Sequence, residues 1–241
     1  MSDAPVLLIG GTRGTGLLIA HSLVQEGLTV RVLARAPDRA ARQLGPAPEI
    51  VFGDITKAAT LFPALAGVRA IIFTAGCRSG RPVGRAQVRR TEYEGVLHTL
   101  DAANRTGFNG RFLYMTASGV GMRSFWTLAL NLYKGNTLLW RKRAEDAIRA
   151  SGLPYTIIRT AVLTNQAAGT RPIRLTQRPL PLSPRYRIAR ADVAAGFVAA
   201  LEHPQTVRST FELVWDRKSQ QLSWDKLFDC VEPDQCIPSL A

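Results

Sequence analysis

The strongest constraint on the fold is a glycine-rich turn that follows a short apolar run near the start of the chain. The run VLLI at residues 6–9 leads into GGTRGTG at residues 10–16, and helix-forming residues follow. In an α/β sheet, the first strand-to-helix turn offers a phosphate free backbone N–H groups and the positive end of a helix dipole. Gly10 then permits the turn, Gly14 lets the backbone approach the phosphate, and Gly16 lets the helix pack on the strand. The pattern predicts a dinucleotide site, and a glycine-rich turn without a ligand is the alternative.

Apolar, β-rich runs recur along the chain with helical stretches between them. The runs show no polar alternation, which is typical of strands covered on both faces. The expected strands are Pro5 to Ile9, Thr29 to Leu33, Glu49 to Phe52, Ala70 to Thr74, Arg111 to Thr116 and Tyr155 to Arg159. The expected helices span residues 15–26, 57–66, 86–106, 136–151 and 191–202. This rhythm predicts an α/β fold, a Rossmann-type doubly wound parallel sheet with helices on both faces.

The length of 241 residues fits one domain. We expect a nucleotide-binding core at residues 4–160, a lid over the substrate with the last helices at 161–230, and an irregular tail at 231–241. Four prolines interrupt the segment 161–187, which therefore predicts loops or short elements covering the cleft.

The net charge of +13 comes mostly from arginine, with 26 Arg and 5 Lys. Such a charge indicates anionic partners, namely nucleic acid, acidic lipid, an acidic protein or a phosphorylated substrate. The alternative is a solvated basic surface, since basic residues occur throughout the chain. No nucleic-acid-binding motif accompanies them, so nucleic acid is not an expected partner, whereas a homo-oligomer stays open. One arginine cluster, Arg78, Arg81, Arg85, Arg89 and Arg90, either attracts an anionic ligand or forms a solvated face.

The remaining composition argues against metal and membrane functions. Cys77, Cys230 and Cys236 are predicted to be reduced thiols, because they lack metal-ligand spacing. His21 and His203, like His98, have no evident acid–base partner and receive no role. No apolar run approaches the roughly 20 residues of a membrane-spanning helix. We expect a cytoplasmic protein without a metal.

Several motifs together resemble the short-chain dehydrogenase/reductase superfamily. The glycine loop is similar to its GxxxGxG loop, Gly53-Asp54-Ile55 to its adenine-holding acidic turn, and Phe73-Thr74-Ala75-Gly76 to its NAAG-type turn. KRAE at 142–145, SGLPYTIIR at 151–159 and RADVA at 190–194 resemble the atypical, NmrA-like, NAD(P)H-binding branch. The resemblance covers residues 5–202 and departs at Thr160, where the branch usually has proline. It implies a coenzyme site made by Gly10, Thr12, Arg13, Gly14, Thr15, Gly16, Arg35, Asp54, Ile55, Thr74, Ala75 and Gly76.

The end of the second strand indicates which coenzyme is bound. NAD sites place an acidic residue there to bind the ribose hydroxyls, whereas this chain reads VRVLAR at residues 30–35. Arg35 and Arg13 can grip a 2′-phosphate with paired hydrogen bonds, so NADP(H) is the expected cofactor. Arg31 is interpreted as an exposed strand arginine. Thr12 either binds phosphate or satisfies its own turn.

The superfamily's usual catalytic pair, a tyrosine followed by a lysine four residues later, is absent from the sequence. Tyr155 and Arg159 have that spacing on a strand, which separates them too far to act together. The resemblance puts the lysine position on Arg141 or Lys142 and the tyrosine position on Thr137 or Leu138.

Other hydroxyl groups are candidates for substrate contact. Tyr133 is expected two turns earlier on the same helix as Arg141, where it either reaches the substrate or is buried. Thr116 and Ser118 follow the fifth strand near the family's substrate-binding serine, and one register puts Ala117 there instead. The candidate catalytic residues are therefore Thr116, Ser118, Tyr133, Arg141 and Lys142.

The resemblance implies an NADPH-dependent oxidoreductase that reduces a small carbonyl, quinone or flavin-like acceptor. The alternative is a non-catalytic NADP(H)-binding sensor, regulatory or assembly protein that docks a partner through its basic surface. The missing tyrosine favours this alternative, and the lid segment favours an enzyme.

Overall fold

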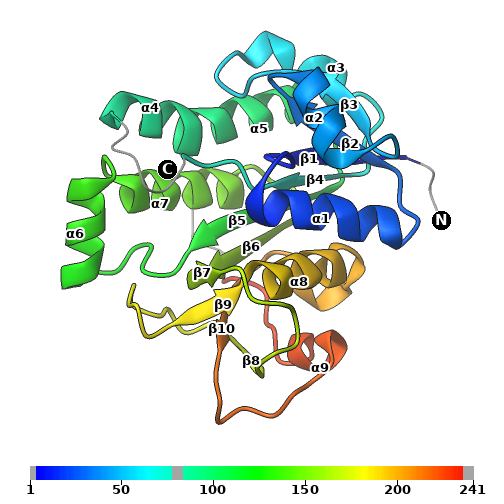
Figure 1. Cartoon of the computed structure of the whole chain (residues 1–241). Coiled ribbons are helices and arrows are strands. Elements are labelled where there is room, and N and C mark those ends of the chain that lie inside the picture. Colours follow the sequence, from blue (N-terminus) through cyan, green and yellow to red (C-terminus); the bar gives the residue numbers. More distant parts are fainter. Residues whose placement is uncertain (1–3, 78–83, 236–241) are drawn as a thin grey trace.

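The computed structural model describes residues 4–77 and 84–235, and its centre is an eight-stranded sheet in the order β3-β2-β1-β4-β5-β6-β10-β8 (Figure 1). Every neighbouring pair is parallel except β10 and β8. The strands of this sheet are β1 (Val6–Ile9), β2 (Val30–Ala34), β3 (Glu49–Phe52), β4 (Ala70–Phe73), β5 (Arg111–Ala117), β6 (Tyr155–Thr160), β8 (Ile173–Thr176) and β10 (Ser209–Trp215). The reversal of strand order between β1 and β4 is the point where α/β sheets bind ligands, because the loops there diverge.

Helices cover both faces of the sheet (Figure 1). On one face lie α1 (Gly14–Gln25), α2 (Pro37–Leu44) and α8 (Arg190–Glu202); on the other lie α3 (Phe62–Leu65), α5 (Gly95–Arg105) and α7 (Thr137–Ala150). Strand β1 supplies both cores, since Val6 and Leu8 pack under α1 while Leu7 and Ile9 pack under α5 and α7. Burial on both faces explains why this strand has no polar alternation.

The Rossmann-type fold predicted from the sequence is confirmed, and all six expected strands are present within about one residue of their expected ends. The sequence interpretation missed α2, α6 (Phe125–Tyr133) and α9 (Trp224–Phe228). It also read residues 86–106 as one uniform helix. The structure has α4 (Arg85–Arg89), the π-helical turn η2 (Arg90–Glu94) and α5 in continuous succession.

One expectation about helix continuity is wrong. Tyr133 ends α6, and it does not share a helix with Arg141. Gly135 and Asn136 have φ values of +58° and +63°, which interrupt the right-handed helix before α7 begins at Thr137. Tyr133 therefore belongs to a separate helix, α6, which lies at the outer side of the molecule (Figure 1).

The proline-rich segment after β6 forms short elements, as its composition predicts. Strands β7 (Val162–Thr164) and β9 (Arg187–Ala189) pair in a small parallel sheet, and β8 joins the edge of the main sheet. The backbone N–H of Gly119 bonds to Leu180 O at 2.9 Å, which ties this segment to the end of β5. The segment therefore lies beside the carboxyl end of the sheet.

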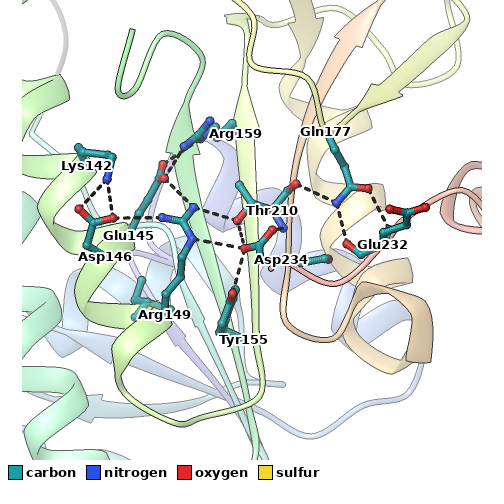
Figure 2. A network of polar contacts seen from close by, with 12 residues as sticks. Lys142, Glu145, Asp146, Arg149, Tyr155, Arg159, Gln177, Thr210, Glu232 and Asp234 are labelled. Atoms are coloured by element: carbon teal, nitrogen blue, oxygen red, sulfur yellow. Dashed lines mark hydrogen bonds and ion pairs between the residues drawn. The ribbon is translucent and has the colours of Figure 1, made fainter. Parts of the chain in front are cut away.

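The described part of the C-terminal tail is irregular, but polar contacts hold it against the sheet (Figure 2). One oxygen of Asp234 accepts hydrogen bonds from Tyr155 Oη at 2.9 Å, Thr210 Oγ1 at 2.6 Å and Arg149 Nε at 3.3 Å. Gln177 bonds to both the backbone N–H and the carbonyl of Glu232. The tail thus contacts α7, β6 and β10, and these contacts hold β10 against the nucleotide-binding core.

Candidate functional site

The glycine loop adopts the geometry that its sequence predicts. Gly10 has φ +93°, and a Cβ built there would lie 2.6 Å from Ala75 N. A Cβ on Gly16 would lie 2.2 Å from Gly10 O, so only glycine lets α1 approach β1 this closely. Gly14 differs, because a Cβ there would meet only Arg190 Nε at 3.9 Å. The space above Gly14 is open for a ligand.

A cleft of about 810 Å³ lies over this loop, and we call it the glycine-loop cleft. All twelve residues that the sequence resemblance implies for the coenzyme line it. The structure adds lining residues that sequence reasoning missed, among them Arg39, Gln43, Cys77, Gln87 and Arg190. Arg39 lies in the first turn of α2, a helix that the sequence did not predict, so this arginine had no place in the predicted site.

The residues of the glycine-loop cleft fit a nucleotide diphosphate. The buried hydroxyl Oγ1 of Thr15 has no hydrogen-bond partner among the described residues, although it lies in the first turn of α1, where an anion would bind. Among the described residues that line the cleft there are four arginines and one carboxylate, which is Asp54. The Asp54 carboxylate is occupied by the backbone N–H and hydroxyl of Thr56, each at 2.9 Å.

Arg31 takes no part in this cleft. Its Nε bonds to Glu49 at 2.7 Å and its Nη1 bonds to the carbonyls of Ala64 and Ala66. The structure thus assigns Arg31 to an ion pair between β2 and β3, whereas Arg35, at the end of β2, lines the cleft.

A second cleft of about 570 Å³ adjoins the first, and we call it the apolar cleft. Its walls come from α6, the start of α7, the ends of β5 and β6, and the segment at 182–184. Met115, Leu163 and Arg190 line both clefts, so the two cavities meet at these side chains. Trp126 and Tyr133 supply aromatic surface on the α6 side.

The structure separates the predicted catalytic residues into two groups. Thr116, Tyr133 and Arg141 line the apolar cleft. Neither Ser118 nor Lys142 is among the described residues that line the two clefts. Lys142 Nζ instead bonds to Asp146 at 2.6 Å on the same helix.

Ser118 is buried without lining either cleft, and its Oγ has no hydrogen-bond partner among the described residues. Ala117, which one register of the resemblance puts at the family's substrate-binding serine, lines the cleft beside Thr116.

A buried ionic cluster lies at the start of α7, which includes the helix positions that the sequence resemblance suggests for the missing tyrosine–lysine pair. Glu92, in the π-helical turn η2, is fully buried, and its Oε2 lies 3.1 Å from Arg141 Nε. The hydroxyl of Thr137 also donates to this oxygen. Thr137 and Arg141 are four residues apart on one face of α7, so they hold the spacing of the usual pair with different side chains. Arg141 Nη1 reaches Met115 O at 3.3 Å, which places the guanidinium where the two clefts meet.

Burial and charge act oppositely on this cluster. Burial raises the pKa of Glu92, but the cations Arg141 and Lys134 outweigh it, so the pKa is lowered overall. Burial lowers the pKa of Lys134, and Glu92 offsets part of that effect. Lys134 Nζ lies 3.9 Å from Glu92 Oε1 and lines the apolar cleft. The cluster is therefore a carboxylate held ionised by two cations.

Sequence reasoning missed Glu92 and Lys134. Glu92 lies on a stretch that reads as an ordinary solvated helix, and only the packing of α7 against η2 buries it. The sequence contained one signal for Lys134. No acidic residue occurs between Asp101 and Glu145, so Lys134 has no carboxylate near it in the chain to pair with.

The described members of the arginine cluster expected after the fourth strand, Arg85, Arg89 and Arg90, line neither cleft. Arg78 and Arg81 fall in the undescribed range, while Arg89 pairs with Glu94 at 2.7 Å. Cys77 and Cys230 are free thiols, and Cys236 lies outside the described range. Across residues 4–77 and 84–235, no group of His, Cys, Asp or Glu could hold a metal ion. In the same part of the chain, no helix has the length and hydropathy to span a membrane.

Comparison with known proteins identifies the class. The NAD(P)H-binding family model matches residues 10–204, and the chain therefore belongs to this family of atypical short-chain dehydrogenases/reductases. Sanguinarine reductase from Eschscholzia californica is 30% identical, over 86% of this chain and 88% of the relative. The photosystem II assembly factor Ycf39 from Synechocystis is 28% identical, over 88% of this chain and 63% of its own length. The solved structure of the anaerobillin reductase ChuY from Escherichia coli O157:H7 shares the fold, with a TM-score of 0.71, 21% identity, and coverage of 91% and 100% of the two chains.

Proposed function

We propose that this chain is an NADPH-dependent reductase that acts on a small carbonyl, quinone or flavin-like acceptor. The observation that supports this most is the junction of the two clefts. A dinucleotide in the glycine-loop cleft extends from Arg35 toward Met115 and Leu163, which also line the apolar cleft. An acceptor in the apolar cleft therefore lies next to the nicotinamide end of the coenzyme. The sanguinarine reductase relative is consistent with this chemistry.

The preference for NADPH over NADH rests on charge at the adenosine end of the cleft. Arg35 and Arg39 line this end, and the end of β2 carries no carboxylate that would repel a 2′-phosphate. A guanidinium can bind a phosphate with two parallel hydrogen bonds, which favours the phosphorylated coenzyme.

Bound NADPH supplies the hydride, and the chain's own residues position the reactants. Arg141 is held by Glu92 and by Met115 O, so its guanidinium is fixed where the nicotinamide ribose would lie. Thr116, buried in the wall of the apolar cleft, offers a hydroxyl to orient the acceptor oxygen. Without a tyrosine acid, the proton comes from solvent in the cleft, and the rate enhancement comes from proximity and orientation.

The test is a binding titration followed by turnover. NADPH fluorescence should change on binding, with NADH binding more weakly, and absorbance at 340 nm should then fall when quinones, flavins or aldehydes are added. Tight NADPH binding without oxidation across the panel would count against the reductase.

The second candidate is a coenzyme-binding protein without turnover, which senses NADP(H) or assists assembly of a partner. The absence of a tyrosine–lysine pair from the sequence favours it, since Thr137 and Arg141, which hold the same spacing on α7, do not act as acids near neutral pH. The Ycf39 relative, described as an assembly factor, is consistent with this role. Coenzyme-dependent capture of a partner together with no oxidation would support it.

A further inference from the structure

The apolar cleft combines aromatic and aliphatic walls with a basic floor. Lys134, Arg141 and Arg190 line it, and among the described lining residues there is no carboxylate. Arg190 is shared with the glycine-loop cleft, where its Nε lies near Gly14, and its Nη1 bonds to the neutral side chain of Asn165 at 2.6 Å. Arg190 thus serves the coenzyme, and the remaining positive charge of the apolar cleft belongs to Lys134 and Arg141.

At the floor of the cleft, two cations share one carboxylate. Glu92 accepts hydrogen bonds from Arg141, from Thr137 and from the backbone N–H of Cys77, so its oxygens are already engaged. Lys134 is left at 3.9 Å, beyond hydrogen-bond distance, and its ammonium makes no hydrogen bond to a described residue. This partly buried ammonium lines the cleft and lies 3.9 Å from the carboxylate that compensates it, so its N–H groups can donate to a ligand that brings an oxyanion into the cleft.

The distribution of charge along the chain points to the same cleft. Residues 102–191 contain 15 Lys or Arg and two acidic residues, so this stretch carries the whole net charge of +13 and the remainder is balanced. Every lining residue of the apolar cleft belongs to this stretch. Basic residues are thus present throughout the chain, but the uncompensated charge belongs to the segment that builds the cleft.

Three exposed arginines add positive charge on segments that adjoin the lining of the apolar cleft in sequence. Arg123 precedes α6, and Arg185 and Arg187 follow Pro184, which lines the cleft. None of the three forms an ion pair with a described residue. A concentration of one sign of charge around an opening raises the local concentration of oppositely charged ligands.

We propose that the apolar cleft binds a planar aromatic acceptor that carries an anionic group, a carboxylate or another oxyanion, and that Lys134 pairs with this group. The aromatic side chains of Trp126 and Tyr133 contact the ring system, and the exposed arginines draw the anion toward the cleft. The ligand's role as hydride acceptor rests on the proposed function, whereas its binding does not require the coenzyme.

Two dyes with the same ring system separate charge from apolar contact. The probes are 1-anilinonaphthalene-8-sulfonate, which is anionic, and N-phenyl-1-naphthylamine, which is neutral. Dye fluorescence is titrated in the presence of saturating NADPH, so that the glycine-loop cleft is occupied. Energy transfer from tryptophan reports where the dye lies, and Trp126→Phe should reduce it if the dye is in the apolar cleft.

Lys134→Met tests the pairing, because it keeps the length of the side chain and removes the charge. It should weaken binding of the anionic dye about tenfold, the size of one charge-assisted hydrogen bond, and leave the neutral dye unchanged. Lys218→Met removes the same charge from an exposed position after β10 and should leave both affinities unchanged. Higher salt should weaken the binding of the anionic dye and leave the binding of the neutral dye unchanged.

Equal affinities for the two dyes in the wild-type protein, or an unchanged anionic affinity in Lys134→Met, would overturn the proposal. Failure of the proposed function has a different signature. Selective binding of the anionic dye through Lys134 without NADPH oxidation by any aromatic carboxylate would uphold the site and refute the reductase. Oxidation only with neutral acceptors would refute the anionic specificity and keep the reductase.

Discussion

Glu92 Oε2 lies 3.1 Å from Arg141 Nε, and this ion pair joins the π-helical turn η2, which follows α4, to helix α7. A π-turn inserted in an α-helix shifts the side chains that follow it and often marks a functional site. Here the turn carries a carboxylate into the interior, where Arg141 and Lys134 compensate it. Arg141 is thereby held rigidly where the two clefts meet.

Glu92→Gln should destabilise the protein strongly, because it leaves two buried cations without a carboxylate. We expect a loss of about 3 kcal/mol in the free energy of unfolding, as measured by urea titration. Glu94→Gln, two residues later, is the matched control, since its partner Arg89 is more than half exposed and the loss should stay below about 1 kcal/mol. Similar losses in both variants would contradict the buried-cluster interpretation.

The same cluster predicts a pH dependence. The pKa of Glu92 is lowered in the folded protein, so its stabilising contribution is present above the unfolded pKa of about 4.3. That contribution is lost as the pH falls through the lowered folded value. The difference in unfolding free energy between wild type and Glu92→Gln should therefore be constant near neutral pH and shrink in acid.

Gly14 and Gly16 should respond differently to substitution, although they are two residues apart. Gly16→Ala places a Cβ 2.2 Å from Gly10 O, which should cost about 3 kcal/mol of stability. Gly14→Val meets no backbone within 4 Å, so the fold should survive with a strain of about 2 kcal/mol from the positive φ. Its side chain would fill the space for the diphosphate and abolish NADPH binding. Thermal unfolding and fluorescence titration measure the two effects, and intact binding in Gly14→Val would refute the assigned phosphate position.

Arg35→Asp should move the coenzyme preference from NADPH toward NADH. The acid would repel the 2′-phosphate and accept hydrogen bonds from the ribose hydroxyls, so we expect the ratio of the two Kd values to change by about tenfold or more. Arg42→Asp, on the exposed face of α2, makes the same charge change outside the cleft and should leave the ratio unaltered. An unchanged ratio in Arg35→Asp would exclude Arg35 as the phosphate ligand.

Cys77 offers a test that needs no mutation, because it lines the glycine-loop cleft while Cys230 is exposed. Burial raises the pKa of the Cys77 thiol, so iodoacetamide should modify it more slowly than Cys230 at neutral pH, with the rate climbing further into the alkaline range. Saturating NADPH should slow the reaction at Cys77 and leave Cys230 as before, as followed by peptide mass spectrometry. If NADPH does not change the rate of modification of Cys77, the coenzyme does not bind in the glycine-loop cleft.

The amino-acid sequence by itself determined the Rossmann-type core of the sheet and the glycine turn beside it, since both depend on local patterns. Strand β1 is buried on both faces and must be apolar throughout, and Gly10, Gly14 and Gly16 are required by the backbone of one turn. Such requirements appear as runs and spacings within a few residues.

Only the tertiary structure decided the floor of the apolar cleft. Glu92, Lys134 and Arg141 come from three different elements, and Gly135 and Asn136 break what reads as one helix into α6 and α7. Whether a charged side chain is solvated or buried depends on which helix packs over it, and that is set by contacts between residues far apart in the chain. The burial that holds Lys134 and Arg141 against Glu92 is therefore a property of the packed fold.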